Sequence, residues 1–313
     1  MNKIQIPETD LKLAPLGLGC VNAGLKWDNT QADALFDAYY EAGGNLYDTA
    51  RVYSDWVKPE RGRSERVIGD WLKRSGKRNH VVICTKGGHP DMTVPCPDLH
   101  KNRVSPEEMR KDLEASLKTL GTDYIDIYIY HRDDETLSVS VLIDTMEEFV
   151  KEGKIRYYGC SNWSTARMKE ADAYCREKKL RGFSVNQALY NVGEEAMNPP
   201  ADDTLKRMDK EMRQYHIENP ENLAMPYMCN CSGFFHKLLK GGIEAVTDSE
   251  YNTPGNLAVF EKLKADMEQY NCTMTQAVLG FFTGLPFACL PLYGPRNKED
   301  IREALKTFEI FGK

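Results

Sequence analysis

The 313-residue sequence has few of the signals that indicate a secreted or metal-binding protein. Its nine cysteines are odd in number and include no C-x-x-C pair, and the nearest two, Cys229 and Cys231, are separated by one residue. We therefore expect reduced thiols rather than disulfides or a zinc site. The opening MNKIQIPETD lacks the apolar stretch of a signal peptide, so we expect a cytoplasmic location.

The sequence also lacks an excess of positive charge and an uninterrupted apolar segment of membrane length. The formal net charge is -6, which offers no basic surface to nucleic acid. Residues 277–294 are largely apolar, but Gly280, Gly284, Pro286 and Pro291 interrupt them. This stretch predicts a buried helix, a loop and a strand rather than a membrane span. We expect neither a nucleic-acid nor a membrane partner.

Short apolar segments alternate with longer amphipathic ones along the whole chain, without a Pro/Gly/Ser-rich linker. Residues 3–13 have the pattern of a β-hairpin that turns at Glu8-Thr9-Asp10. The strands predicted after it are residues 16–20, 45–47, 81–85, 125–130, 156–160, 183–187, 223–228 and 288–292. Amphipathic periodicity predicts helices over residues 30–42, 64–74, 142–151, 165–178 and 298–306, and another that begins after Ser105.

Two of these helices have recognisable start signals. Ser105-Pro106-Glu107-Glu108 combines an N-cap serine, a proline at the first helical position and a capping glutamate. Thr30 is the predicted N-cap of helix 30–42. Eight strand–helix units favour a closed barrel over an open sheet. The sequence therefore predicts one domain over residues 1–313: an α/β protein, a (β/α)8 TIM barrel with an N-terminal β-hairpin and long loops at its C-terminal face.

Functional side chains of such barrels lie just past the carboxyl ends of the strands. Polar residues stand at these places here: Asp48, Lys86, His131, Ser161-Asn162 and Gln187, with Tyr53 on the loop after Asp48. Each residue alone is weak evidence, since a strand-end aspartate commonly caps a turn and a strand-end lysine is commonly solvated. The complete set is far less expected by chance.

The motifs around these residues resemble those of the aldo-keto reductases. They are D-T-A-x-x-Y, T-K after the third strand, H-R-D after the fourth, G-x-S-N after the fifth and V-N-Q after the sixth, in the family's order. The opening P-L-G-L-G-C also resembles the family's first strand. The resemblance implies an NAD(P)H-dependent oxidoreductase that transfers hydride between nicotinamide and a carbonyl or alcohol carbon of a small, sugar-like or otherwise polar substrate. It also implies a catalytic tetrad of Asp48, Tyr53, Lys86 and His131.

The chemistry of these side chains suits the implied roles. A carbonyl that accepts hydride develops negative charge on oxygen and needs a nearby proton donor. The phenol of Tyr53 has an ordinary pKa near ~10, and the ammonium of Lys86 beside it favours the phenolate. Asp48 would hold Lys86 charged and in place, and His131 would orient the carbonyl oxygen through a hydrogen bond.

The resemblance also implies a cofactor site. Ser161, Asn162 and Gln187 would bind the nicotinamide carboxamide. Tyr227 is either the aromatic residue that stacks on the nicotinamide ring or a core residue of the seventh strand. Arg296 suits a 2'-phosphate, which favours NADP(H) over NAD(H). Further cofactor contacts are implied for Gly19, Cys20, Asp48, Gly294, Asn297 and Glu303.

The chain departs from the family's pattern near the implied phosphate contacts. Where family members commonly read Y-S-P-L, this chain reads Tyr227-Met228-Cys229-Asn230, so the serine hydroxyl that helps hold the pyrophosphate is missing. Asp300 stands at a position that is often basic in NADP-dependent members. Long loops also flank the site, over residues 54–63, 87–104 and 192–203. Trp56 could contact a sugar-like substrate, together with Tyr53 and His131, or pack its loop onto the barrel rim.

Two other functions are compatible with parts of the sequence. A cofactor-binding regulatory subunit of the same fold would not require proton transfer, so the complete tetrad argues against it. A metal-dependent barrel hydrolase could use the set His89, His100, His131, Asp133 and Asp134. That set has neither an H-x-H after the first strand nor a tight cluster at ligand spacing, so we expect no metal.

Overall fold

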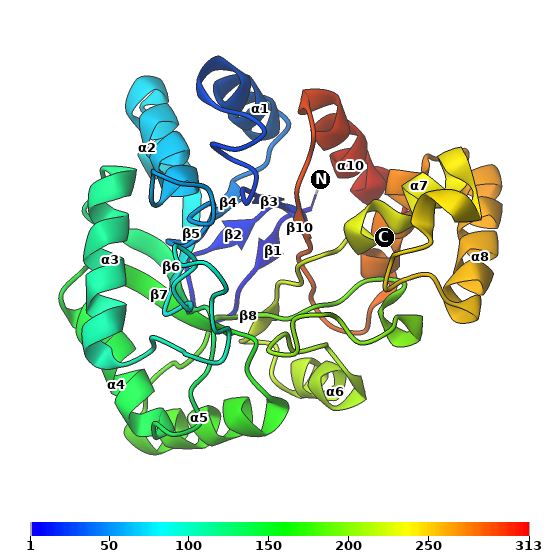
Figure 1. The fold of residues 1–313 in the computed structure, drawn as a ribbon. Helices are drawn as coiled ribbons and strands as arrows, with labels where there is room; N and C mark the ends of the chain where they lie inside the picture. Colours follow the sequence, from blue (N-terminus) through cyan, green and yellow to red (C-terminus); the bar gives the residue numbers. More distant parts are fainter. Residues whose placement is uncertain (1, 313) are drawn as a thin grey trace.

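The computed structural model describes residues 2–312, in which eight parallel strands form a ring surrounded by helices (Figure 1). The strands are β3 (Gly17–Gly19), β4 (Leu46–Asp48), β5 (Val82–Gly87), β6 (Ile125–Tyr130), β7 (Ile155–Ser161), β8 (Val185–Gln187), β9 (Leu223–Ala224) and β10 (Leu292–Tyr293). They pair in the order β10-β3-β4-β5-β6-β7-β8-β9. A parallel bridge between Ala224 and Cys289, and a 2.8 Å hydrogen bond from Leu290 N to Ala224 O, close the ring. The predicted (β/α)8 barrel is confirmed.

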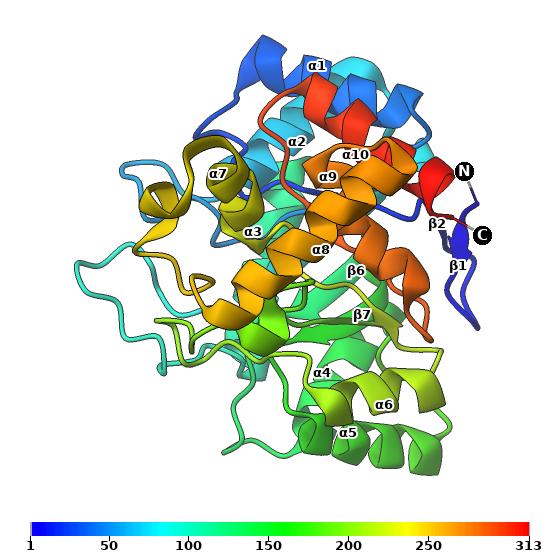
Figure 2. The same cartoon turned by 90° about the vertical axis from the view of Figure 1, so that its right-hand side faces the viewer.

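Helices follow the strands and cover the outside of the barrel (Figure 1). They are α1 (Asn29–Glu41), α2 (Arg63–Ser75), α3 (Pro106–Leu120), α4 (Val139–Lys151), α5 (Thr165–Lys178), α6 (Lys210–Glu218), α7 (Phe234–Gly241), α8 (Pro254–Tyr270), α9 (Met274–Gly280) and α10 (Lys298–Ile310). The predicted hairpin is present as β1 (Ile4–Gln5) and β2 (Lys12–Leu13). It lies at one end of the barrel, opposite the long loops that follow the strands (Figure 2). Within the described residues, no helix is long and apolar enough to cross a membrane.

Side chains alternate between the barrel interior and the helices, as they must along a strand. On β6, Ile127 and Ile129 pack with the hairpin residues Ile6 and Leu13 inside the barrel, whereas Tyr128 packs toward the helices. Residues that fill the interior therefore lie two positions before the polar residues at the strand ends. These pairs are Leu46 before Asp48, Cys84 before Lys86, Ile129 before His131 and Val185 before Gln187.

Several predicted boundaries are corrected by the structure. The seventh strand ends at Ala224 rather than Met228, because Pro226 has no N–H with which to extend the ladder. The last strand is Leu292–Tyr293 and begins after Pro291, whereas residues 288–292 were expected. Helix α1 is capped by Asp28, whose carboxylate accepts from Asn29 N, and not by Thr30. A carboxylate interacts favourably with the partial positive charge of a helix N-terminus.

Candidate active site

The predicted tetrad residues lie together at the carboxyl ends of β4, β5 and β6. Lys86 is at the centre, where its Nζ donates to Asp48 Oδ2 at 2.8 Å, to the Thr49 carbonyl at 2.7 Å and to the Tyr53 hydroxyl at 3.0 Å. The ring of His131 packs edge-on against Tyr53, with the ring centroids 5.7 Å apart. An ammonium held between a carboxylate and a phenol is the arrangement that stabilises a phenolate.

Burial and charge act in opposite directions on the proton affinities of this group. Burial raises the pKa of Tyr53, and the nearby Lys86 ammonium opposes this shift without cancelling it. The effect expected of Lys86 is therefore present, but desolvation outweighs it. Burial alone would lower the pKa of Lys86, but Asp48 and Tyr53 reverse this shift and hold that pKa above its usual value. Lys86 is thus a permanently charged neighbour of a neutral Tyr53 phenol.

His131 is buried and is held in its neutral form. Burial lowers its pKa well below the usual range, and His89, Arg132 and Lys86 lower it further. The ring of His89 contacts it at a centroid distance of 4.7 Å. His131 Nδ1 is buried and has no hydrogen-bond partner in the described residues. A neutral imidazole beside Tyr53 can donate one hydrogen bond to a carbonyl oxygen without supplying a charge.

A cavity of about 590 Å³ opens above the tetrad and extends toward the last strand. It is large enough for a sizeable organic ligand. The predicted site residues that line it are Gly19, Cys20, Asp48, Tyr53, Lys86, His131, Ser161, Asn162, Gln187, Tyr227, Gly294 and Arg296. Residues from both ends of the sequence therefore meet in one space.

The groups beside the tetrad have the donors and acceptors that a carboxamide requires. Gln187 Nε2 is already bound to Asp48 Oδ1 at 2.7 Å, which leaves Gln187 Oε1 as an acceptor. Asn162 Oδ1 accepts from the Tyr227 hydroxyl at 2.6 Å and from Lys206 N at 3.1 Å, and Asn162 Nδ2 donates to Ser161 Oγ at 3.1 Å and to the His131 carbonyl at 3.4 Å. The Ser161 hydroxyl hydrogen and Gln187 Oε1 therefore offer one donor and one acceptor to an amide. These residues fit a nicotinamide carboxamide.

The loop after β9 supplies cavity residues that the sequence did not single out. Asn230, Ser232 and Gly233 line the cavity, and Met228 and Ser232 have positive φ angles of 55° and 51°. Ser232 places a hydroxyl in the cavity, on the same loop as Met228, which stands where family members commonly have a serine. The local sequence gave no sign of this placement, because positive φ at non-glycine residues depends on tertiary packing.

Arg296 lines the cavity but is already paired. Its Nε and Nη2 donate to the two carboxylate oxygens of Asp300 at 2.8 and 3.0 Å, and its backbone N also donates to Asp300 at 2.9 Å. The Arg296 side chain is 81% exposed, whereas that of Asp300 is 7% exposed. Asp300 stands at a position that is often basic in NADP-dependent members, and its carboxylate contacts the Arg296 guanidinium.

Three of the predicted site residues do not line this cavity. Trp56 is 46% exposed on the loop after β4. Asn297 is the N-cap of α10, because its Oδ1 accepts from Asp300 N at 2.9 Å. Glu303 lies on α10 and its side chain bonds to the hydroxyl of Thr273. Asn297 and Glu303 therefore stabilise local structure around the site.

Comparison with known proteins agrees with this geometry. The family model described as the aldo/keto reductase family matches residues 15–311. An aryl-alcohol dehydrogenase of Pestalotiopsis microspora is 27% identical over 99% of this chain and 78% of its own length. The uncharacterized oxidoreductase YrpG of Bacillus subtilis is 24% identical over 99% of this chain and 92% of its own length. An NADP(+) aryl-alcohol dehydrogenase of Phanerodontia chrysosporium is 30% identical over 72% of this chain and 58% of its own length. Because the family model covers nearly all of its sequence, this chain belongs to the aldo/keto reductase family.

Proposed function

We propose that this chain, an NAD(P)H-dependent oxidoreductase, interconverts a carbonyl and an alcohol with Tyr53 as the general acid and base. The observation that carries the proposal is the position of Lys86 Nζ, 2.8 Å from Asp48 Oδ2 and 3.0 Å from the Tyr53 hydroxyl. A buried phenol is a poor acid unless a positive charge stabilises its anion. Lys86 supplies that charge, and Asp48 and the Thr49 carbonyl keep it in place.

The proton and the charge are handled by the chain's own side chains. Tyr53 donates its proton to the carbonyl oxygen as negative charge develops there, and it recovers the proton in the opposite direction. Neutral His131 donates a hydrogen bond to the same oxygen, which orients the carbonyl toward the phenol. Because Tyr53, Lys86 and His131 are all fixed before substrate binds, little reorganisation accompanies the transfer.

The cofactor is proposed to lie along the cavity from β7 to the start of α10. Ser161, Asn162 and Gln187 would hold the carboxamide, and Tyr227 would pack against the ring. A reduced nicotinamide bound there supplies the hydride. The hydrogen bond from Tyr227 to Asn162 Oδ1 fixes both side chains, which supports a binding role for this pair over core packing alone.

We further propose that NADP(H) is preferred to NAD(H), by a modest factor on the order of tenfold. The guanidinium of Arg296 suits a 2'-phosphate and is open to solvent at the end of the cavity. The bidentate bond from Asp300 limits the gain, because a phosphate must compete with that carboxylate.

For the substrate we propose a small carbonyl compound with polar groups. Arg132 and Lys26 line the cavity with the tetrad and supply charged contacts for such groups. Aryl aldehydes and alcohols are the second class to test, since two relatives bear the name aryl-alcohol dehydrogenase.

The test is turnover of purified protein with aldoses, cyclitols, simple aldehydes and aryl aldehydes, each with NADPH and NADH. Loss of reduced-nicotinamide absorbance with at least one carbonyl compound supports the proposal, and this rate must persist in a chelator. Cofactor binding without turnover of any reactive aldehyde would contradict it and favour a regulatory subunit. Activity that survives the chelator but vanishes without nicotinamide would exclude a metal-dependent hydrolase.

A further inference from the structure

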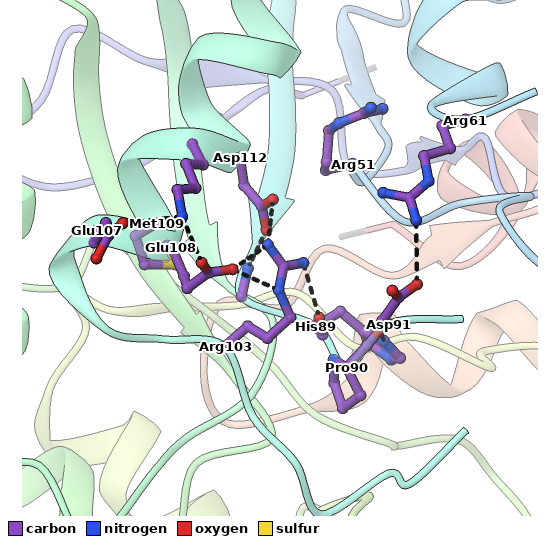
Figure 3. A network of polar contacts seen from close by, with 12 residues as sticks. Arg51, Arg61, His89, Pro90, Asp91, Arg103, Glu107, Glu108, Met109 and Asp112 are labelled. Carbon is purple, nitrogen blue, oxygen red and sulfur yellow. Dashed lines mark hydrogen bonds and ion pairs between the residues drawn. The ribbon is translucent and has the colours of Figure 1, made fainter. Parts of the chain in front are cut away.

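A second cavity of about 250 Å³ lies beside the tetrad, between the loops after β4 and β5 and the first turns of α3. Its wall includes four cationic side chains that the proposed chemistry does not use: Arg51, Arg61, Arg103 and Lys111. Figure 3 shows Arg61 and Arg103 on either side of this space, with Arg51 and His89 also at its edge. The hydrogen-bond acceptors around these cations determine which of them is free to bind a ligand.

Two of the four cations are fully engaged by carboxylates. Arg103 Nε donates to Glu108 Oε2 at 2.7 Å, and its Nη2 donates to Asp112 Oδ1 at 3.0 Å. Lys111 Nζ lies 2.9 Å from Glu107 Oε1 and 3.1 Å from Glu108 Oε1. These pairs build the wall on the α3 side and leave little charge there for a ligand.

Arg51 is different, because its guanidinium makes no hydrogen bond to residues 2–312. The nearest carboxylate oxygen, Glu65 Oε2, is 3.7 Å from Arg51 Nη1, and both atoms are buried without a hydrogen-bond partner. The absence of a side chain at Gly62 leaves space for the Arg51 guanidinium, because a Cβ there would lie 1.7 Å from Nη1. Gly62 also has a φ of +64°. An unsatisfied buried guanidinium N–H is costly, so the site has a reason to take an acceptor.

Arg61 also retains free donors. Its Nη2 donates to the Thr93 hydroxyl at 2.7 Å and lies 3.5 Å from Asp91 Oδ1, while its Nε and Nη1 make no hydrogen bond to the described residues. The carboxylates of the wall take up other donors. Asp91 Oδ1 accepts from Thr93 N and Thr93 Oγ1, Asp55 Oδ1 accepts from Gly62 N, and Asp112 accepts from Gly88 N and Arg103. Arg51 and Arg61 therefore retain N–H donors that make no hydrogen bond to these carboxylates.

We propose that this cavity binds a small oxyanion, either free phosphate or the head of a phosphate monoester, through Arg51 and Arg61. Guanidinium forks match the oxygens of phosphate in spacing and charge. His89 adds a selective contact. Its Nδ1 lies 3.0 Å from the Pro90 carbonyl, which can only accept, so the neutral ring leaves Nε2 as an acceptor for the O–H of hydrogen phosphate or of a monoester monoanion.

The cofactor cavity is the competing place for phosphate, and Arg296 distinguishes the two. We would titrate inorganic phosphate into cofactor-free protein by calorimetry, using the wild type and the Arg61→Gln and Arg296→Gln variants. The Arg61 side chain is more than half exposed, so its substitution leaves the core intact. We expect Arg61→Gln to weaken the tightest phosphate-binding event about tenfold or more, and Arg296→Gln to leave that event unchanged, because Arg296 lines the cofactor cavity and not this one. No step of this test requires the proposed reaction.

Two further measurements complete the test. Gly62→Ala displaces the Arg51 guanidinium without removing a charge, and it should also weaken phosphate binding; circular dichroism would verify that the variant is folded. Tighter binding of glycerol phosphate than of inorganic phosphate identifies a monoester as the ligand, and equal or weaker binding identifies free phosphate. The proposal is overturned if wild type binds no phosphate, or if binding survives Arg61→Gln and is lost in Arg296→Gln.

Discussion

Gln187 Nε2 donates a 2.7 Å hydrogen bond to Asp48 Oδ1, although the two residues are 139 positions apart. The other oxygen of Asp48 accepts from Lys86, so one carboxylate joins the proposed carboxamide contact to the proposed proton-transfer group. This bond also fixes the orientation of the Gln187 amide and leaves its oxygen as the acceptor in the cavity. The proposed nicotinamide and substrate positions are therefore set by a shared side chain.

Tyr53→Phe should abolish turnover and leave cofactor affinity nearly unchanged, because the lost hydroxyl is the proposed proton donor. Tyr227→Phe is the matched control. It removes a second hydroxyl from the same cavity, but one that donates to Asn162 Oδ1. We expect that variant to change the cofactor Kd more than kcat. A Tyr53→Phe enzyme that kept more than about a tenth of wild-type kcat, a loss of only ~1.4 kcal/mol, would rule out Tyr53 as the acid.

Lys86→Met should damage kcat about as strongly and shift the pH dependence of the residual rate upward. The reason is that Lys86 opposes the effect of burial on Tyr53, so its removal raises the pKa of the phenol further. The pH profile of kcat in the wild type and the variant is the measurement. Lys111→Met, at an exposed lysine of α3, should change neither rate nor profile. A normal rate with an unshifted profile in Lys86→Met would remove this residue from the mechanism.

Arg296→Ala should weaken NADP binding about tenfold and leave NAD binding almost unchanged, since only NADP has a 2'-phosphate. Asp300→Asn should have the opposite effect. It removes a negative charge that is paired with the guanidinium at 2.8 and 3.0 Å, so NADP should bind several-fold more tightly. Dissociation constants from fluorescence quenching would test both variants. Equal losses for the two cofactors in Arg296→Ala would show that Arg296 contacts a group they share.

Glu65→Gln should change how the free energy of unfolding depends on pH. Glu65 is fully buried, and burial raises its pKa from the ordinary 4.5 to about 7. The folded protein then binds this proton more tightly than the unfolded chain does. The stabilisation is complete below pH 4.5 and is lost as the pH rises to about 7, by on the order of 3 kcal/mol.

Urea unfolding of wild type and Glu65→Gln across that pH window would measure this effect as a difference in slope. The glutamine can still accept the 2.7 Å hydrogen bond from Thr85 Oγ1, so the packing is preserved. Glu177→Gln, at an exposed position of α5, should leave the slope of the wild type unchanged. Parallel curves for wild type and Glu65→Gln would show that this carboxyl titrates normally in the folded protein.

Strand and helix positions were predicted best where local signals are strong. The apolar segment Ile125–Tyr130 and the amphipathic segment Thr165–Lys178 have the predicted bounds, and Ser105 caps α3 as its sequence indicates. Predictions failed where the hydrogen bonding of a single residue, rather than a hydrophobic pattern, sets the limit of an element. The strand that includes Leu223 stops before Pro226, and Asp28 rather than Thr30 begins α1.

The sequence by itself determined the barrel and the place of the tetrad. Side chains alternate along a strand, so a polar residue two positions after an interior one must face the same space, as Lys86 does after Cys84. Only the tertiary structure decided which loop residues reach that space. It brought Ser232 to the cavity and left Trp56 exposed outside it. Loop conformation depends on contacts between segments distant in sequence, and no local periodicity records them.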